Sequence, residues 1–253
     1  MRDEMDILEK RIKDRFEEIS GKSWFSEEIE EDNFQLRELL WFFQDLKGKT
    51  ILEIGCASGR FVKQLAKRGA HVTGIDISER LIERARRNVS SARFFVGSAT
   101  NLPFTDGEFD YVYSIETFEH IPDTGKGISE ACRVLKEGGK IVIIDKNYFG
   151  LHPNFLMPNP IRKFVLETVN KTMYENKFGY KERHFKKSDL DSYLGLYCRR
   201  RHTRFLPGFR PGPKMSSLKK RFPALVNIKI IATNMIYRLL PFTSYCIAWR
   251  WEK

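Results

Sequence analysis

The sequence predicts an α/β fold with a doubly wound, mostly parallel sheet, and three observations lead to this prediction. Short apolar runs rich in β-branched residues, such as Thr50–Ile54, alternate with segments of helical spacing, such as Glu79–Asn88. Glycine turns and helix caps separate these segments, as expected where crossover helices join parallel strands. The length of 253 residues suits one large domain with additions.

The charge of the chain is large and unevenly distributed. The formal net charge is +11. Acidic residues are frequent before Asp45, whereas the segment from Lys181 to Arg221 is densely basic. Such asymmetry indicates an anionic partner, which can be a nucleic acid, a phospholipid or an acidic substrate. For any single basic cluster, a solvated surface is the simpler interpretation.

The cysteines and the N-terminal segment predict a cytoplasmic protein. The four cysteines form no C-x-x-C pair, which is typical of reduced thiols and favours neither disulfides nor a metal site. The charged N-terminus lacks the apolar core of a signal peptide. No run approaches the roughly 18 apolar residues of a membrane-spanning helix.

The segment from Thr50 to Phe61 is the centre of the functional prediction. A buried strand leads into a turn with Gly55 and Gly59 and then into a helix, so a ligand can lie against bare backbone. Asp76 follows Gly55 by 21 positions, at the end of the next apolar run, where a carboxylate can bind ribose hydroxyls. A dinucleotide fingerprint would have its second and third glycines where this chain has Ala57 and Arg60, so the glycines that bring backbone against a pyrophosphate are missing. A nucleoside without phosphates suits this turn better, and a cationic one would tolerate the nearby Glu53.

These residues resemble motif I of the class I S-adenosylmethionine-dependent methyltransferases, and Asp76 matches the acid that follows it. Two later stretches also resemble the family, Glu119-His120-Ile121 and the Leu-Lys-x-Gly-Gly sequence that ends at Gly139. The resemblance covers roughly Lys49–Asp145 and is nearest to small-molecule enzymes such as those of ubiquinone and menaquinone biosynthesis. It implies a seven-stranded sheet whose last strand is antiparallel.

The resemblance also implies that the cofactor is S-adenosylmethionine. Its binding residues would come from the turn, the ends of the strands and the loops that follow: Glu53, Gly55, Cys56, Ala57, Gly59, Asp76, Ile77, Ser98, Ala99 and Ile115. Members of the family often have an acid, which contacts the adenine amino group, where this chain has Ser98. This contact is the main departure from the family pattern.

The sulfonium group is already a reactive electrophile, so we expect the protein to position the substrates and exclude water. His120 is the candidate base, because its side chain can accept a proton near neutral pH. An equal alternative is a histidine that only hydrogen-bonds its own loop. Candidate substrate residues are Glu116, Tyr148 and His184, although packing would also explain Tyr148 and surface placement would explain His184.

The domain organisation predicted from the sequence has a helical cover and one catalytic domain. Residues 1–46 are expected to form two helices that cover the site or simply pack, and residues 47–253 to form the methyltransferase domain. Helical lid insertions are expected at about 147–180 and 207–241.

These insertions contain amphipathic helices at about Pro160–Met173 and Ala224–Leu240. Their apolar stripes can pack on the sheet or lie in a membrane interface, and we expect packing. On that reading they wall an apolar substrate pocket, and contact with a membrane surface is weak at most.

The sequence thus predicts methyl transfer to a small, partly hydrophobic acceptor by in-line displacement. An RNA methyltransferase that uses the basic C-terminal half is one alternative. However, the N/D-P-P-Y/F motif of base-amino methylation is absent, and Cys132 lies in a predicted helix rather than beside a proline. We therefore expect no strong binding to nucleic acid. A cofactor-binding protein without catalysis is the other alternative. The acceptor atom and the oligomeric state are left open.

Overall fold

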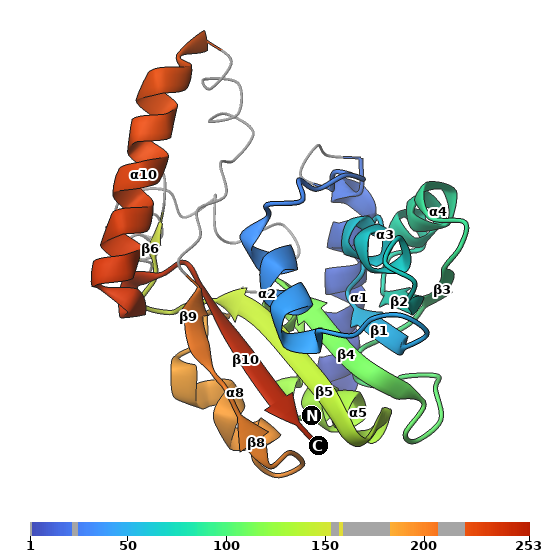
Figure 1. Cartoon of the computed structure of the whole chain (residues 1–253). Coiled ribbons are helices and arrows are strands. Elements are labelled where there is room, and N and C mark those ends of the chain that lie inside the picture. Colours follow the sequence, from blue (N-terminus) through green and yellow to red (C-terminus); the bar gives the residue numbers. More distant parts are fainter. Residues whose placement is uncertain (1, 22–24, 153–156, 159–182, 207–220) are drawn as a thin grey trace.

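A computed structural model describes residues 2–21, 25–152, 157–158, 183–206 and 221–253. A central twisted sheet carries helices on both of its faces, and α10 (Pro223–Leu239) projects from one corner (Figure 1). The predicted helix at Pro160–Met173 and most of the first lid insertion lie outside the described residues.

Seven strand positions make up the sheet, as predicted. Five parallel strands follow the order β3, β2, β1, β4, β5, with the bounds Arg93–Val96, His71–Asp76, Thr50–Ile54, Phe109–Ile115 and Leu135–Lys146. β10 (Cys246–Glu252) runs antiparallel to β5. β8 (Arg200–Arg201) and β9 (Arg204–Leu206) both pair with β10, so they occupy the edge position as one interrupted strand. β6 (Leu151–His152) and β7 (Met157–Pro158) form a separate hairpin.

The two faces of the sheet are covered by different helices (Figure 1). One core contains buried side chains from α2 (Phe34–Phe43), α3 (Arg60–Ala66) and α4 (Glu79–Asn88). The opposite core contains side chains from α5 (Thr124–Arg133) and α8 (Lys187–Leu194). Alternate residues of β1 enter the two cores, Ile51 the first and Leu52 the second, because successive side chains of a strand point to opposite faces.

Local capping explains where several helices begin. The Asn33 side chain accepts hydrogen bonds from the first turn of α2. The Ser78 side chain caps α4 in the same way, accepting from the backbone N–H of Leu81. Asp123 accepts from the backbone N–H of Lys126 at the start of α5. Each cap satisfies a backbone donor that a helix terminus would otherwise leave without a partner.

The N-terminal segment forms the two expected helices, α1 (Arg2–Ile19) and α2. α2 is fixed to the sheet by a buried ion pair, since Glu38 lies 3.1 Å from Arg250 Nη1 and 3.0 Å from Arg204 Nη2. Arg204 belongs to the basic segment from which we inferred an anionic partner. Part of that basic charge is therefore neutralised within the protein.

One packing prediction is wrong. The apolar stripe of the segment Ala224–Leu240 was expected to pack on the sheet, but five of its side chains are 60–68% exposed: Leu225, Ile228, Ile231, Met235 and Leu239. A different side of α10 is buried and includes Val226 and Tyr237. Apolar residues therefore occur on both the buried and the exposed sides of α10. Within the described parts of the chain, no helix has the length and apolarity needed to cross a bilayer.

Candidate functional site

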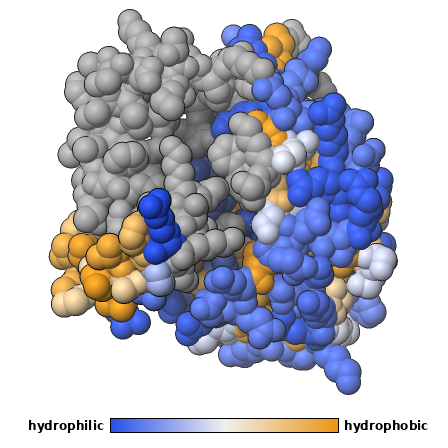
Figure 2. All heavy atoms as spheres, turned by 90° about the horizontal axis from the view of Figure 1, so that it is seen from above, coloured by the Kyte–Doolittle hydropathy of each residue, from blue (hydrophilic) through white to orange (hydrophobic). Residues whose placement is uncertain are grey.

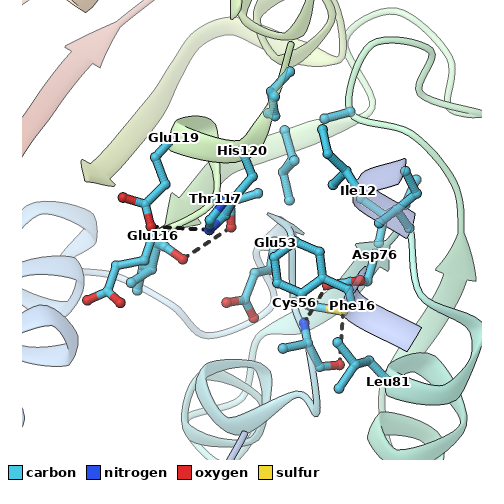
Figure 3. A pocket seen from close by; sticks show the side chains of 18 of the residues that line it. Ile12, Phe16, Glu53, Cys56, Asp76, Leu81, Glu116, Thr117, Glu119 and His120 are labelled. Atoms are coloured by element: carbon cyan, nitrogen blue, oxygen red, sulfur yellow. Dashed lines mark hydrogen bonds and ion pairs between the residues drawn. The ribbon is translucent and has the colours of Figure 1, made fainter. Parts of the chain in front are cut away.

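A cavity of about 320 Å³ lies at the carboxyl ends of the parallel strands. Its wall includes the last residues of β1, β2, β4 and β5, namely Ile54, Asp76, Ile115 and Lys146. Ligands of open α/β sheets bind at this edge, because the loops that follow the strands diverge there. Figure 3 shows side chains from the β4 loop on one side of the cavity and those of α1 and β2 on the other.

The two glycines of the turn after β1 lie at positions where a side chain would be strained and would crowd its neighbours. Gly55 has φ +75°, and a Cβ at this position would lie 2.2 Å from Oγ1 of Thr117 in the loop after β4. Gly59 has φ +77°, and its Cβ would lie 3.2 Å from the Phe94 ring. The expectation that these glycines mainly make room for a ligand is therefore incomplete. They also let Thr117 of the loop after β4 and Phe94 of β3 pack closely against the turn.

Asp76 holds the turn in place from the end of β2. Its Oδ2 accepts from the backbone N–H of Ala57 at 2.9 Å, and its Oδ1 accepts from Ser78 N–H at 3.0 Å. Burial raises the pKa of this carboxyl, while these backbone N–H groups oppose the rise. Each carboxylate oxygen has a second lone pair. Asp76 can therefore accept from ligand hydroxyls without breaking the turn.

Glu53 places a second carboxyl at the cavity, on the central strand β1. It is 2% exposed, and Tyr113 Oη donates to its Oε2 at 2.9 Å. Burial raises the pKa of Glu53 to about 8. A cationic ligand beside this group would favour its ionised form, because an opposite charge at short distance lowers the pKa of an acid.

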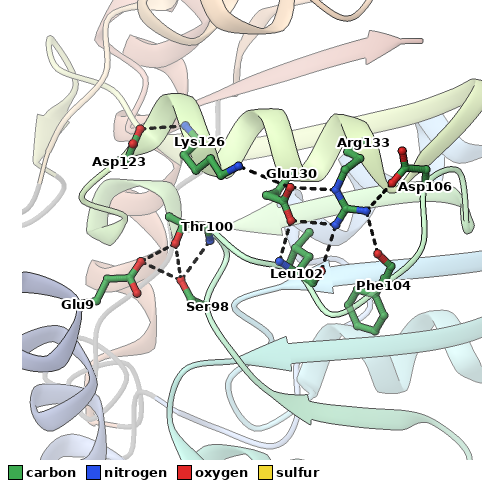
Figure 4. Close-up of polar contacts among 10 residues, drawn as sticks. All are labelled: Glu9, Ser98, Thr100, Leu102, Phe104, Asp106, Asp123, Lys126, Glu130 and Arg133. Carbon is green, nitrogen blue, oxygen red and sulfur yellow. Dashed lines mark hydrogen bonds and ion pairs between the residues drawn. The ribbon is translucent and has the colours of Figure 1, made fainter. Parts of the chain in front are cut away.

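An acid from another element reaches the position of Ser98. Glu9 of α1 accepts hydrogen bonds at its Oε1 from Ser98 Oγ at 2.8 Å and from Thr100 Oγ1 at 2.7 Å (Figure 4). Both Glu9 and Ser98 line the cavity. The carboxylate that the sequence lacks in the loop after β3 is therefore present nearby, supplied by the N-terminal helix. Figure 4 also shows that the nearby Arg133–Glu130 pair is a separate network.

The loop after β4 enters the cavity with an unusual backbone conformation. Glu116 has φ +52°, which side chains other than glycine rarely adopt, and its Oε1 accepts from Gln35 Nε2 of α2 at 2.9 Å. Such strained residues concentrate at functional sites, where the surroundings hold them in place. The turn that follows, η1 (Phe118–His120), contributes Glu119 and His120 to the cavity wall.

His120 lies next to the ion pair of Glu119 and Lys146. Its Nε2 is 3.2 Å from Oε1 of Glu119, and Lys146 Nζ donates to the same oxygen at 2.6 Å (Figure 3). The Phe16 ring packs edge-on against the imidazole, with ring centroids 5.1 Å apart. The side chain of Glu119 is 1% exposed, so Lys146 provides the charge that a buried carboxylate requires. This arrangement fixes the orientation of the imidazole.

Eleven of the fourteen site residues inferred from the sequence line this one cavity: Glu53, Gly55, Cys56, Ala57, Asp76, Ile77, Ser98, Ala99, Ile115, Glu116 and His120. Gly59, Tyr148 and His184 are not part of its wall. Tyr148 is exposed and packs against Phe149, with Lys186 above its ring. Its backbone N–H donates to the carbonyl of Phe185, so it lies beside the segment that contains His184.

Sequence reasoning left open whether the N-terminal helices cover the site or simply pack, and it named neither the residues of α1 that line the cavity nor the ion pair of Lys146 with Glu119. Glu9, Ile12 and Phe16 line the cavity from one side of α1, at helical spacing. Their periodicity predicts the helix but not which surface it covers. Lys146 does carry a signal, because a charged residue at the end of a buried strand lies at the ligand-binding edge of the sheet. Among the described residues, no group of three or more His, Cys, Asp or Glu could hold a metal ion.

Comparison with known proteins agrees with this geometry. Residues 52–143 match a family described as a methyltransferase domain. Tocopherol O-methyltransferase of Arabidopsis thaliana is 33% identical over 138 residues, which are 52% of this chain and 40% of that protein. The 2-methyl-6-phytyl-1,4-hydroquinone methyltransferase of Synechocystis sp. is 41% identical over 104 residues, 40% of this chain and 33% of that protein. The chain thus spans well under half the length of these two relatives.

The fold also has counterparts among solved structures. A chain in the complex of the Haloferax volcanii Trm112 methyltransferase activator with a methyltransferase superposes with a TM-score of 0.63. The match covers 95% of this chain and 96% of that one at 17% identity, so it concerns the fold alone. Sheet order, the glycine turn and the matched family agree over the same residues. Residues 52–143 thus match a methyltransferase domain and adopt the sheet order of the solved counterpart, in agreement with the family that the sequence resembles.

Proposed function

We propose that this protein transfers the methyl group of S-adenosylmethionine to a small, partly hydrophobic acceptor. The observation that carries the proposal is that the glycine turn, Asp76 and His120 line one cavity at the carboxyl edge of the sheet. Asp76 would hold the ribose, and the backbone after Gly55 would lie along the ligand. Glu53 would face the cationic part of the cofactor, which supplies the electrophilic methyl group.

In this proposal Glu9 takes over the adenine contact that the family assigns to an acid after β3. Its carboxylate is already oriented by the hydroxyls of Ser98 and Thr100. A carboxylate can accept two further hydrogen bonds on its second oxygen, and an amino group can donate one there. The N-terminal helix would then be part of the cofactor site as well as its cover.

His120 would accept the proton that a hydroxyl acceptor loses during transfer. His120 Nε2 lies 3.2 Å from Glu119 Oε1, so in this proposal Nε2 carries the hydrogen and the lone pair that accepts the new proton would be on Nδ1. The positive imidazolium that forms is stabilised by the Glu119 carboxylate. Glu119 and Lys146 would thus act as positioning residues, holding the ring and compensating its charge.

The wall of the cavity and the relatives both support a phenolic or hydroquinone acceptor with an apolar substituent. Ile12, Phe16, Phe25 and Ile121 provide apolar surface next to the polar groups. The two relatives described above are named for methylating tocopherol and a phytyl hydroquinone. A prenylated hydroquinone is therefore the first acceptor to test.

Cofactor binding is tested by calorimetry with S-adenosylmethionine and its demethylated product. Asp76→Asn should weaken binding by about 1–3 kcal/mol, because a charged acceptor of hydrogen bonds is lost. Asp32→Asn, on an exposed loop, is the matched control and should bind as the natural protein does. Equal affinity of Asp76→Asn and the control would remove Asp76 from the cofactor site.

The role of Glu9 is tested by a double-mutant cycle with Ser98. Glu9→Gln should weaken cofactor binding by about 1–2 kcal/mol, since a charged contact becomes neutral. Ser98→Asp should also weaken it, because two carboxylates would meet at the distance of the present hydrogen bond. In the double variant the new acid replaces the old one, so affinity should recover. Strictly additive losses would contradict the proposed replacement.

A further inference from the structure

The exposed stripe of α10 is a large apolar surface on one helix. The five side chains from Leu225 to Leu239 described above follow at spacings of three and four residues, so they form one line along the helix. Phe242 continues this surface in η2 (Pro241–Thr243) and is 53% exposed. Figure 2 shows apolar side chains gathered at the corner of the molecule where α10 lies. At about 25 Å, the helix is long enough to act as a separate contact surface.

The sequence around this stripe carries only one sign of charge. Between Ser192 and Trp251 there are twelve Lys and Arg residues and no Asp or Glu. Arg221 precedes α10 and Arg238 lies in its last turn, and both are exposed. A helix with an apolar stripe, basic residues and no acid is complementary to a surface with an apolar interior and anionic headgroups.

The structure fixes α10 at the same edge of the sheet as the cavity. The helix leads through η2 into β10, whose first residue, Cys246, pairs with Lys146 at the end of β5. The Asn147 side chain donates to the carbonyl oxygens of Phe242 and Ser244 at 2.7 and 2.8 Å. Lys146 lines the cavity. A flat surface that binds α10 would therefore lie next to the carboxyl edge of the sheet.

We propose that α10 is a docking helix for anionic lipid bilayers, which lies in the interface with its exposed stripe among the acyl chains. Arg221 and Arg238 would contact the headgroups. The alternative of a second copy of this chain is less suited to the charge, because two such basic surfaces would repel each other. RNA would engage the basic residues but would leave the apolar stripe in water. The proposal concerns binding alone and stands independently of methyl transfer.

Co-sedimentation with vesicles tests the proposal. The natural protein should bind vesicles of phosphatidylglycerol and phosphatidylcholine, and at least about tenfold more weakly vesicles of phosphatidylcholine alone. Ile231→Asp should weaken binding to the anionic vesicles by about tenfold or more, because an aliphatic side chain that would lie among the acyl chains is replaced by a charge. Arg238→Gln, which removes one cation, should weaken it by about fivefold.

Leu196→Asp is the matched control. It makes the same change of charge at an apolar residue that is 73% exposed. Leu196 lies far from α10, three residues before Arg199, whose backbone N–H donates to the carbonyl of Glu252 at the C-terminal end of β10. Binding by this variant should stay within about twofold of the natural protein. Leu225→Gln adds no charge and should still weaken binding, which separates loss of apolar contact from repulsion.

Several results would overturn the proposal. One is that the natural protein does not sediment with anionic vesicles, and another is that Ile231→Asp and Leu196→Asp lose binding equally. If the natural protein sediments as a dimer without lipid and Ile231→Asp dissociates that dimer, the stripe would be a contact surface for a second copy of this chain. Salt-sensitive binding to RNA without vesicle binding would assign the basic segment to nucleic acid.

Discussion

Replacing Glu53 by Gln tests the electrostatics of the cavity most directly. The carboxyl is buried on the central strand, and burial raises its pKa from the ordinary value of 4.5 to about 8. Gln is similar in shape, and its carbonyl can accept the hydrogen bond that Tyr113 now donates to Glu53 at 2.9 Å. The variant therefore removes a titrating group with little change in packing.

The pKa of Glu53 makes stability depend on pH with a definite sign. Between its unfolded and folded pKa values, the folded chain holds a proton that the unfolded chain has lost. Folding takes up a proton in this window, so the stabilisation is present below the unfolded pKa and declines as pH rises toward 8. From about pH 5.5 to 7.5, the free energy of unfolding should fall by about 2–3 kcal/mol more in the natural protein than in Glu53→Gln.

Urea unfolding at several pH values measures this difference. Glu83→Gln, an exposed carboxyl on α4, serves as the control for the removal of a charge and should follow the natural protein across the range. A stability difference between the natural protein and Glu53→Gln that does not change with pH would refute the reasoning. Saturating S-adenosylmethionine should flatten the pH dependence of the natural protein, because a nearby cation favours the carboxylate.

Two further predictions concern the turn and the base. Gly55→Ala should destabilise the fold by more than Gly138→Ala in urea unfolding: both residues have positive φ, but only at Gly55 would a Cβ meet a side chain, that of Thr117. If both variants lost the same free energy of unfolding, about 1 kcal/mol each, Thr117 would be able to move away from the new Cβ without cost. His120→Gln should lower kcat for a hydroxyl acceptor by about a hundredfold or more and leave the cofactor Kd unchanged. His71→Gln, at the exposed start of β2, should retain the natural rate, and an unchanged kcat for His120→Gln would exclude a general base at this position.

Some elements of this protein are determined by residues close together in the chain. The glycine turn after Ile54, the Ser78 cap of α4 and the alternation of strands with helices follow from local backbone preferences and periodicity. These features also place Asp76 and His120 at the carboxyl edge, because parallel strands end on the same side of a sheet. The doubly wound, mostly parallel sheet and eleven residues of the cavity wall could therefore be predicted from the sequence.

Other features depend on how the elements dock, which short-range patterns do not encode. Glu9 meets Ser98 across 89 positions of sequence, and Lys146 meets Glu119 across 27. The amphipathic pattern of α10 predicts a helix and an apolar stripe, but the same pattern suits packing and exposure equally. Only the tertiary structure decides which stripe is covered, because burial depends on the elements that surround a helix, whereas periodicity depends on the helix alone. The sequence by itself thus determined the sheet and the glycine turn, and the tertiary structure decided which acid reaches the position of Ser98 and that the stripe of α10 faces outward.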